Sequence, residues 1–209
     1  MRVEGGPPRV GCDSQAGGLG GPTRRPSISA LQLKIDLLGI DPPSWRRILV
    51  PASVTLPALH RVFQQVMGRQ DSHLHAFEIK NRHYVMPGVD EFGDFPDDLV
   101  EDGVKIAELL DVGDSFAYEY DYGDNWQHLV VLEAISSVGS ALVRAVCLGG
   151  ERACPPEDVG GISGYAYFLE AVGDPSHEEH EDYLVWAGGS FYPEAFNLAE
   201  VNARLQRLG

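Results

Sequence analysis

The sequence predicts a single α+β domain, in which an antiparallel sheet of hairpins and a meander is joined by one early amphipathic helix and a C-terminal helical segment. Three observations lead to this prediction. Apolar and polar residues alternate along several short segments before residue 150, an apolar period of 3.6 residues occurs once near residue 60, and helix-capping residues appear after residue 160. Helices that are segregated from the strands are typical of the α+β class.

Residues 1–29 are predicted to form a disordered tail, which leaves residues 30–209 as the domain. The tail contains seven Gly and four Pro and few apolar neighbours, so burial cannot offset the entropy lost on ordering. A solvated extension, a misassigned start codon and a basic arm for an acidic partner are all compatible with this composition.

A β-hairpin is predicted at the start of the domain. Apolar residues recur at every second position over residues 31–37, and residues 45–50 form the returning strand. Two prolines within residues 41–44 fix the backbone and remove hydrogen-bond donors, which favours a turn between the two strands.

An amphipathic helix is predicted to follow, from Leu56 to Met67. Apolar side chains recur there at helical spacing, namely at Leu56, Leu59, Val62, Phe63, Val66 and Met67. Thr55 occupies the position of an N-cap, Pro57 lies in the first turn, and Gly68 ends the segment.

The centre of the chain is predicted to contain two further strand pairs and an acidic loop. Residues 73–80 and 82–86 form the first pair, and residues 115–121 and 126–133 form the second. The loop between the pairs, residues 90–102, holds seven carboxylates and no basic residue.

The last part of the chain is predicted to be one strand followed by helices. A strand over residues 141–148 completes a meander beside the second pair, and residues 165–172 form a short helix. Asp174 is expected to cap a second helix, and Asn197 with Glu200 resembles a capping box for a third.

Charge and apolar content exclude several classes of protein. The formal net charge is -15, and residues 30–209 hold 12 basic against 29 acidic residues, so direct binding to a nucleic-acid backbone is not expected. No apolar run has the length of a membrane span or a signal peptide, which makes a cytoplasmic protein the expectation. Three cysteines are too few for a disulfide scaffold but leave one bridge or a metal site open.

Five segments of the sequence resemble the Ri-plasmid open-reading-frame-three-like family, and they occur in the family's order. The segments read LQLKIDLLGIDPPSWRRILVP (31–51), DSHLHAFEI (71–79), YEYDYGDNWQHLVVLE (118–133), CLGGERACPPEDVGGISGY (147–165) and DPSHEEHEDYLVWAGGSFYPEAFNLAEVN (174–202). The resemblance covers residues 30–209 and implies a compact α+β domain.

Members of that family are also labelled as passenger or TnpR-like proteins of an insertion element, which implies an association with mobile elements. The residues do not support a recombinase. A serine resolvase requires a nucleophilic serine, clustered arginines and a basic helix-turn-helix, whereas Ser14 and Ser27 lie in the tail and the domain is acidic. The resemblance therefore gives a family and a fold but no reaction.

The first candidate site is a functional surface on two turn-rich segments. Its members are Asp121, Asp124, Trp126, His128, Glu157 and Asp158. The turn between the strands of the second pair brings the first two carboxylates and the imidazole of His128 to one end of a hairpin, where they could bind a metal or position a substrate. The favoured interpretation is structural: the aspartates stabilise the turn, and Trp126 and His128 fill the core.

A second candidate is a zinc site that Cys147 and Cys154 would form with His177 and His180. Thiolates and imidazoles suit zinc, and the histidines, three residues apart, would share one face of the helix after Asp174. Neither spacing matches the usual halves of a zinc motif, so buried thiols, a disulfide and exposed histidines are the alternatives.

The third candidate is the pair His73 and His75, which lie two residues apart and so share one face of a predicted strand. Such a pair can supply half of a metal site, and His128 on a neighbouring strand would strengthen it. A half-exposed strand face that carries polar residues explains the pair more simply.

The composition favours a non-catalytic interaction or regulatory module whose partner is a basic protein. The expected contact surfaces are the acidic loop at 90–102, an acidic helix around residues 178–182 and the turn at residues 121–125. The alternatives are a metal-dependent enzyme or zinc-stabilised fold that uses part of the ligand set above, and an acidic surface that imitates DNA. Whether the protein is an enzyme, and how it oligomerises, leave no signature in the sequence.

Overall fold

An eight-stranded sheet forms the centre of the computed structural model, which describes residues 1, 28–89, 97–138 and 144–208. The strands, in chain order, are β1 (Ile28–Leu37), β2 (Trp45–Pro51), β3 (His75–Ile79), β4 (Arg82–Val85), β5 (Leu99–Val100), β6 (Ser115–Tyr120), β7 (Trp126–Val138) and β8 (Val146–Glu151). Their spatial order is β5-β4-β3-β6-β7-β1-β2-β8, and only β4 and β5 run parallel. The predicted α+β domain with a largely antiparallel sheet is confirmed.

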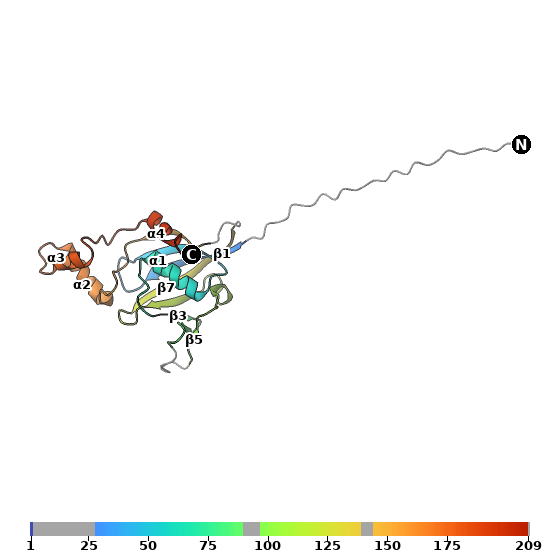
Figure 1. Ribbon diagram of the computed structural model, residues 1–209, viewed down its shortest axis with the longest axis horizontal. Helices are drawn as coiled ribbons and strands as arrows, with labels where there is room; N and C mark the ends of the chain where they lie inside the picture. Colours follow the sequence, from blue (N-terminus) through green and yellow to red (C-terminus); the bar gives the residue numbers. More distant parts are fainter. Residues whose placement is uncertain (2–27, 90–96, 139–143, 209) are drawn as a thin grey trace.

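The helices are segregated from the strands, as predicted. They are α1 (Leu56–Met67), α2 (Gly161–Gly173), α3 (His180–Trp186) and α4 (Leu198–Leu205), with a short 3-10 helix η2 (Ile106–Glu108). Figure 1 shows α1 across one face of the sheet, α4 beside it, and α2 with α3 as a lobe at one end. The main hydrophobic core lies between α1 and the sheet.

The first hairpin and the first helix form where the sequence predicts them. Leu33 and Ile35 of β1 are fully buried, and Asp36 pairs with Trp45 of β2 beside the turn. Gly68 ends α1 with a φ of 82°, a left-handed conformation that glycine adopts without steric cost. Thr55 occupies the N-cap position, but its side chain makes no capping hydrogen bond.

The strand predicted over residues 141–148 takes a different place in the sheet. It begins at Val146 as β8 and pairs with β2, whereas the prediction placed it beside β7 in a meander. Both edges of β7 are already occupied, because β6 pairs with one edge and β1 with the other. The free edge of β2 therefore receives the last strand.

The prediction of a helix beginning at Asp174 is wrong. Asp174 Oδ1 accepts hydrogen bonds from the backbone and hydroxyl of Ser176, at 2.8 and 2.7 Å, and this local turn replaces a helical first turn. The helix α3 starts later, at His180, so His177 precedes it and the two histidines do not share a helix face. The cap on α4 is as predicted: Asn197 Oδ1 accepts from the backbone N–H groups of Ala199 and Glu200.

Two predictions fall largely outside the described residues. Residues 2–27 of the predicted tail and residues 90–96 of the acidic loop are not described, while β1 begins at Ile28, inside the predicted tail. Within the described part of the chain, no helix is both long and apolar enough to cross a membrane.

Candidate functional site

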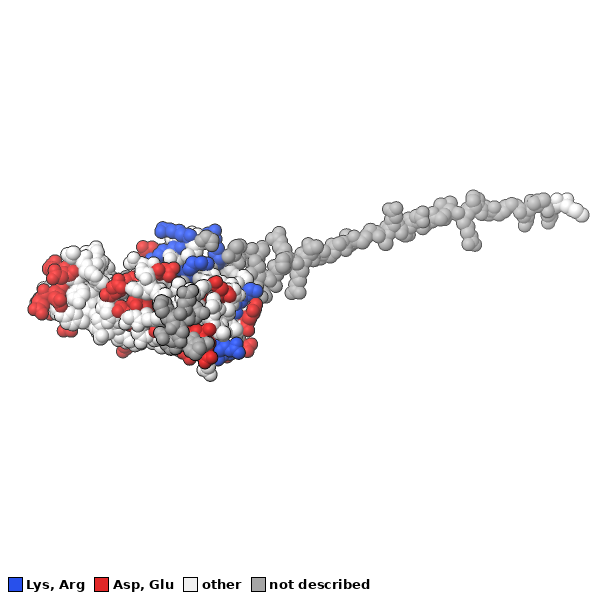
Figure 2. Space-filling view, turned by 60° about the horizontal axis from the view of Figure 1, so that its bottom comes forward, with Lys and Arg blue, Asp and Glu red and all other residues white. Residues whose placement is uncertain are grey.

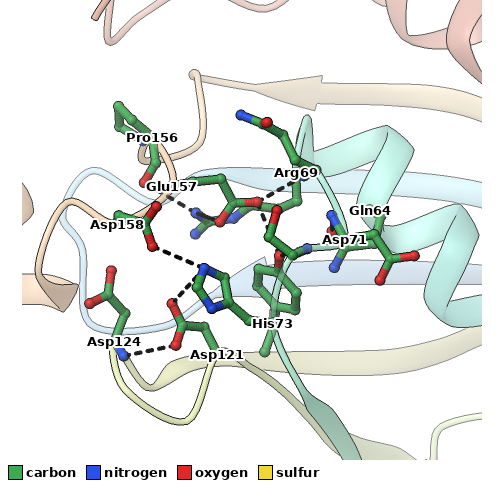
Figure 3. Close-up of polar contacts among 12 residues, drawn as sticks. Gln64, Arg69, Asp71, His73, Asp121, Asp124, Pro156, Glu157 and Asp158 are labelled. Carbon is green, nitrogen blue, oxygen red and sulfur yellow. Dashed lines mark hydrogen bonds and ion pairs between the residues drawn. The ribbon is translucent and has the colours of Figure 1, made fainter. Parts of the chain in front are cut away.

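A polar cluster lies where the turn after β6 meets the segment that leads into α2 (Figure 3). Gly160 donates its backbone N–H to Asp124 Oδ2 at 3.2 Å. The next residue, Gly161, has a φ of 66°, and a Cβ atom there would lie 2.7 Å from the backbone oxygen of Asp124. Only glycine allows this close approach of the two backbones, so the packing of one loop on the other depends on it.

Asp121 shapes the turn with one carboxylate oxygen and leaves the other free for a different role. Its backbone is left-handed, with a φ of 62°. Oδ1 accepts the backbone N–H groups of Gly123 and Asp124, at 3.0 and 3.3 Å. These bonds are the turn stabilisation expected of an aspartate in a tight turn. The second oxygen, Oδ2, points toward His73 (Figure 3).

The imidazole of His73 lies between two carboxylates. Its Nε2 atom is 3.0 Å from Asp158 Oδ1 and 3.6 Å from Asp121 Oδ2. One atom from each of the three side chains fits within a span of 4.8 Å. Nε2 is buried, yet it makes no hydrogen bond of acceptable geometry, so proximity rather than a directed bond joins it to the oxygens. Donor atoms bound to one metal at about 2.1 Å lie roughly 3.0–3.5 Å apart, and the two distances from His73 Nε2 to the carboxylate oxygens, 3.0 and 3.6 Å, are close to that range.

Glu157 holds the segment that carries Asp158 against the body of the protein. Its Oε1 atom accepts the backbone N–H of Gln70 at 2.8 Å and the hydroxyl of Tyr120 at 3.1 Å. Its Oε2 atom lies 3.4 Å from Nη1 of Arg69. These contacts fix the loop on the side of the cluster opposite to Asp121.

Arg69 and Tyr120 are buried, which strengthens their interactions with the loop. The side chain of Arg69 is only 2% exposed, and its guanidinium lies 4.9 Å from the ring centre of Trp126. Burial raises the pKa of Tyr120 to about 12, so its hydroxyl remains a hydrogen-bond donor to Glu157 at neutral pH. Nε and Nη2 of Arg69 have no hydrogen-bond partner among the described residues.

His75 is separated from this cluster by its burial and its partners. Its ring stacks on that of His60 from α1, with centroids 3.5 Å apart, and its Nε2 atom lies 3.1 Å from Glu101 Oε2. His60 in turn contacts Asp71 Oδ1 and the hydroxyl of Tyr118. Burial, and next the adjacent His75, lower the pKa of His60. His73 precedes β3, so the two histidines do not share a strand face as predicted.

A comparison with models of protein families identifies the family of this chain. The model of the plasmid pRiA4b ORF-3-like protein family matches residues 29–200. The chain belongs to this family. The match confirms the resemblance that the five sequence segments indicate, and three of those segments, at 71–79, 118–133 and 147–165, supply the three side chains of the cluster around His73.

Two relatives share most of the length of this chain. The uncharacterized protein y4hQ of Sinorhizobium fredii is 37% identical over 186 residues, which are 86% of this chain and 92% of that protein. The crystal structure of a protein of unknown function, MM3350 from Methanosarcina mazei Go1, is similar with a TM-score of 0.76 and 35% identity. The similarity covers 84% of this chain and 98% of that one.

A third histidine of the family segments, His128, is a core residue. It is 2% exposed, and its Nδ1 atom lies 3.2 Å from the backbone oxygen of Tyr118. Burial, with a smaller contribution from the charge of Arg69, lowers its pKa to about 4. Trp126 beside it is completely buried. Neither residue reaches the cluster around His73 as a ligand within the described residues.

The four residues of the predicted zinc site do not come together. Among the described residues, the group around His73 is the only set of three His, Cys, Asp or Glu side chains with the spacing of a metal site. Cys147 and Cys154 are both free thiols, and burial raises the pKa of Cys147. His180 Nδ1 lies 2.8 Å from the backbone oxygen of Ala171, and the His177 ring packs on Tyr167.

Sequence reasoning did not find Arg69, Tyr120 or His60. A signal for His60 was present, because it follows Leu56 by four residues and precedes Phe63 by three, which places it on the apolar face of α1. A polar residue on such a face needs a buried partner. Arg69 follows the end of α1 and carries no comparable pattern.

Proposed function

We propose that the protein binds a divalent cation through His73, Asp121 and Asp158. The observation that carries the proposal is the convergence of one imidazole nitrogen and two carboxylate oxygens within 4.8 Å, with Nε2 of His73 free of hydrogen bonds. The two carboxylate oxygens of Asp121 make different contacts, which supports the same proposal: Oδ1 stabilises the turn, and Oδ2 is left for the metal.

The donor set favours a transition metal such as Zn²⁺ or Mn²⁺. An imidazole suits Zn²⁺, whereas carboxylates also suit harder ions such as Mn²⁺. Three protein ligands leave at least one coordination position open, as in catalytic rather than structural zinc sites. The carboxyl group of Asp158 is 72% exposed and His73 is 29% exposed, so solvent or a substrate can reach the ion. A bound cation there would polarise a water or a substrate oxygen.

The test is equilibrium binding of Zn²⁺ and Mn²⁺ to purified protein and to two conservative variants. Asp121→Asn retains an oxygen for the turn but loses the charge, and Asp158→Asn changes an exposed side chain. Each is expected to weaken binding by more than tenfold, because each removes a charged ligand. Thermal melts check that the variants remain folded.

The matched control is Asp124→Asn, in the same turn. Its carboxylate accepts the N–H of Gly160 and lies outside the donor set, and an amide oxygen can replace that acceptor. Its affinity for the metal should stay within about threefold of the unmodified protein, because no ligand is lost. Equal weakening by all three variants, or none by Asp121→Asn and Asp158→Asn, would refute the proposed ligand set.

A second candidate function is binding to a basic protein partner through the lobe of α2 and α3. No residue of α3 is buried, and Val185 is 75% exposed beside the half-exposed Trp186. Four carboxylates lie just before α3 or in its first turn: Glu178, Glu179, Glu181 and Asp182. Figure 2 shows acidic side chains gathered on the lobe. Apolar side chains rimmed by one sign of charge are typical of an interaction surface for the opposite charge.

This second candidate is tested with a synthetic peptide rich in Lys and Arg and containing one Leu. Its binding should weaken with rising salt, and Val185→Ser or Glu181→Gln should weaken it further, because both change the proposed surface. Glu108→Gln, which changes an exposed side chain at the end of η2, is the control for a general loss of charge. Equal affinity of the lobe variants and the control would refute the surface. A link to mobile elements is a proposal that rests on the plasmid in the family's name.

A further inference from the structure

A pocket of about 270 Å³ lies between the N-terminal half of α1, the end of β2 and the end of α4, far from His73 along the sheet. Its apolar lining comes from β2, α1, α4 and the segments that follow β2 and α4: Val50, Val54, Val62, Leu205 and Leu208. The first four of these are buried. Pockets for drug-sized ligands have volumes of roughly 300–1,000 Å³ and mostly apolar walls, so this pocket, slightly below that range, has room only for a small ligand.

Two positively charged residues line this pocket. Arg61 and Arg144 both line it and are exposed. Arg61 has no ion-pair or hydrogen-bond partner within the part of the chain that the structure describes. Arg144 donates one N–H to the backbone oxygen of Gln206, at 2.6 Å, which directs its side chain along the end of α4.

Arg61 belongs to a group of basic side chains that make no ion pair with a carboxylate among the described residues. The sequence holds 31 acidic residues against 16 Lys and Arg. Six of the described Lys and Arg side chains do form ion pairs with carboxylates. Figure 2 shows blue side chains gathered at the upper edge of a face that is otherwise mostly white, with red patches and some further blue at the lower right. Arg61 and Arg144 are the members of this unpaired group that line the pocket, where both can contact an anion from outside the chain.

The start of α1 contributes a further donor at the pocket. Thr55 and Ala58 both line it, and Thr55 makes no capping hydrogen bond to the helix. Leu56 donates its N–H to the backbone oxygen of Val104, and Pro57 has none. The first free N–H of the helix is therefore that of Ala58, at the positive end of the helix dipole. No acidic residue lies in this first turn to neutralise it.

We propose that this pocket binds a small amphipathic anion, a monocarboxylate with an apolar chain of medium length. The carboxylate meets Arg61, Arg144 and the N–H of Ala58. The chain lies on the apolar floor between α1 and α4. Charge and apolar surface are both required: the arginines select the headgroup, and the valine and leucine side chains select the tail.

The experiment is calorimetric titration of the full chain at fixed ionic strength with octanoate, hexanoate, acetate and octan-1-ol. Octanoate should bind one site per chain, and the two fewer methylenes of hexanoate should weaken binding by about tenfold. Acetate lacks the tail and octan-1-ol lacks the charge, so both should bind too weakly to saturate. No saturable binding of octanoate, or equal affinity for hexanoate and octanoate, would overturn the proposal.

Two variants locate the site. Arg61→Gln removes one charge from an exposed side chain and should weaken octanoate binding by about tenfold. Ala58→Leu fills the pocket and should abolish binding, with the melting temperature showing that the chain is folded. The control is Arg82→Gln, on β4, which also has no carboxylate partner among the described residues and lies away from the pocket. Equal loss of affinity in Arg61→Gln and Arg82→Gln would overturn the assignment of the site.

Discussion

The contact of Gly161 with Asp124 makes a quantitative prediction about how the two loops of the candidate site are held together. Gly161 has a φ of 66°, and an added Cβ would lie 2.7 Å from a backbone oxygen that cannot rotate away. A left-handed residue with a Cβ costs about 1–2 kcal/mol. Forcing extra volume into a packed contact costs typically about 1–3 kcal/mol. Gly161→Ala is therefore expected to lower the free energy of unfolding by about 2–5 kcal/mol.

The same helix supplies a matched control. Gly173, at the other end of α2, has no left-handed φ, and a Cβ added to it would meet no atom within 4 Å. Gly173→Ala should raise the free energy of unfolding by up to about 0.5–1 kcal/mol, because alanine loses less backbone entropy on folding. Urea unfolding measures both values, and the melting temperature of Gly161→Ala should fall by roughly 10 °C. Equal stability of the two variants would show that the loops are not in the contact described.

Three further predictions concern the core. Arg46→Met should lower the free energy of unfolding in urea by about 3–5 kcal/mol. Arg46 is 3% exposed, and its guanidinium donates to four backbone oxygens that would lose their donor. A decrease below about 1 kcal/mol would contradict this prediction. Burial lowers the pKa of His128 to about 4, whereas in the unfolded chain this histidine takes up a proton near pH 6.5. The contribution of His128 to the free energy of unfolding is therefore complete above pH 6.5 and falls by about 3 kcal/mol as the pH drops to 4. His128→Gln should flatten this part of the pH profile, and an unchanged profile would refute the assignment. Because Cys147 and Cys154 are free thiols, dithiothreitol should leave the urea midpoint unchanged; a shift would indicate a bridge.

Local patterns in the sequence were enough to predict most of the elements. Alternation identifies β1 and the hairpin of β6 and β7, because every second side chain of these strands is buried. The helical period and Gly68 identify α1 and its end. Asp174 shows the limit of local reasoning. An aspartate can cap a helix, but the side chain of Asp174 stabilises a turn instead, and α3 begins later in the chain.

The candidate site could be predicted only in part, because its members meet through tertiary contacts. Asp121 and Asp158 belong to the predicted functional surface and His73 to the predicted histidine pair, but no spacing in the sequence joins them. They meet because glycines let the segment before α2 approach the turn after β6, and because the buried Arg69 holds Glu157. The sheet order, which determines these contacts, depends on which strand edges are free.

The most direct test of the proposed cation site is the anomalous scattering of a crystal grown with Zn²⁺. We expect one strong peak about 2.0–2.2 Å from His73 Nε2, Asp121 Oδ2 and Asp158 Oδ1, with the remaining coordination positions of the ion facing solvent. A peak at Cys147 or Cys154 instead, or no peak at the junction of the two loops when the ion saturates the protein in solution, would contradict the proposed site.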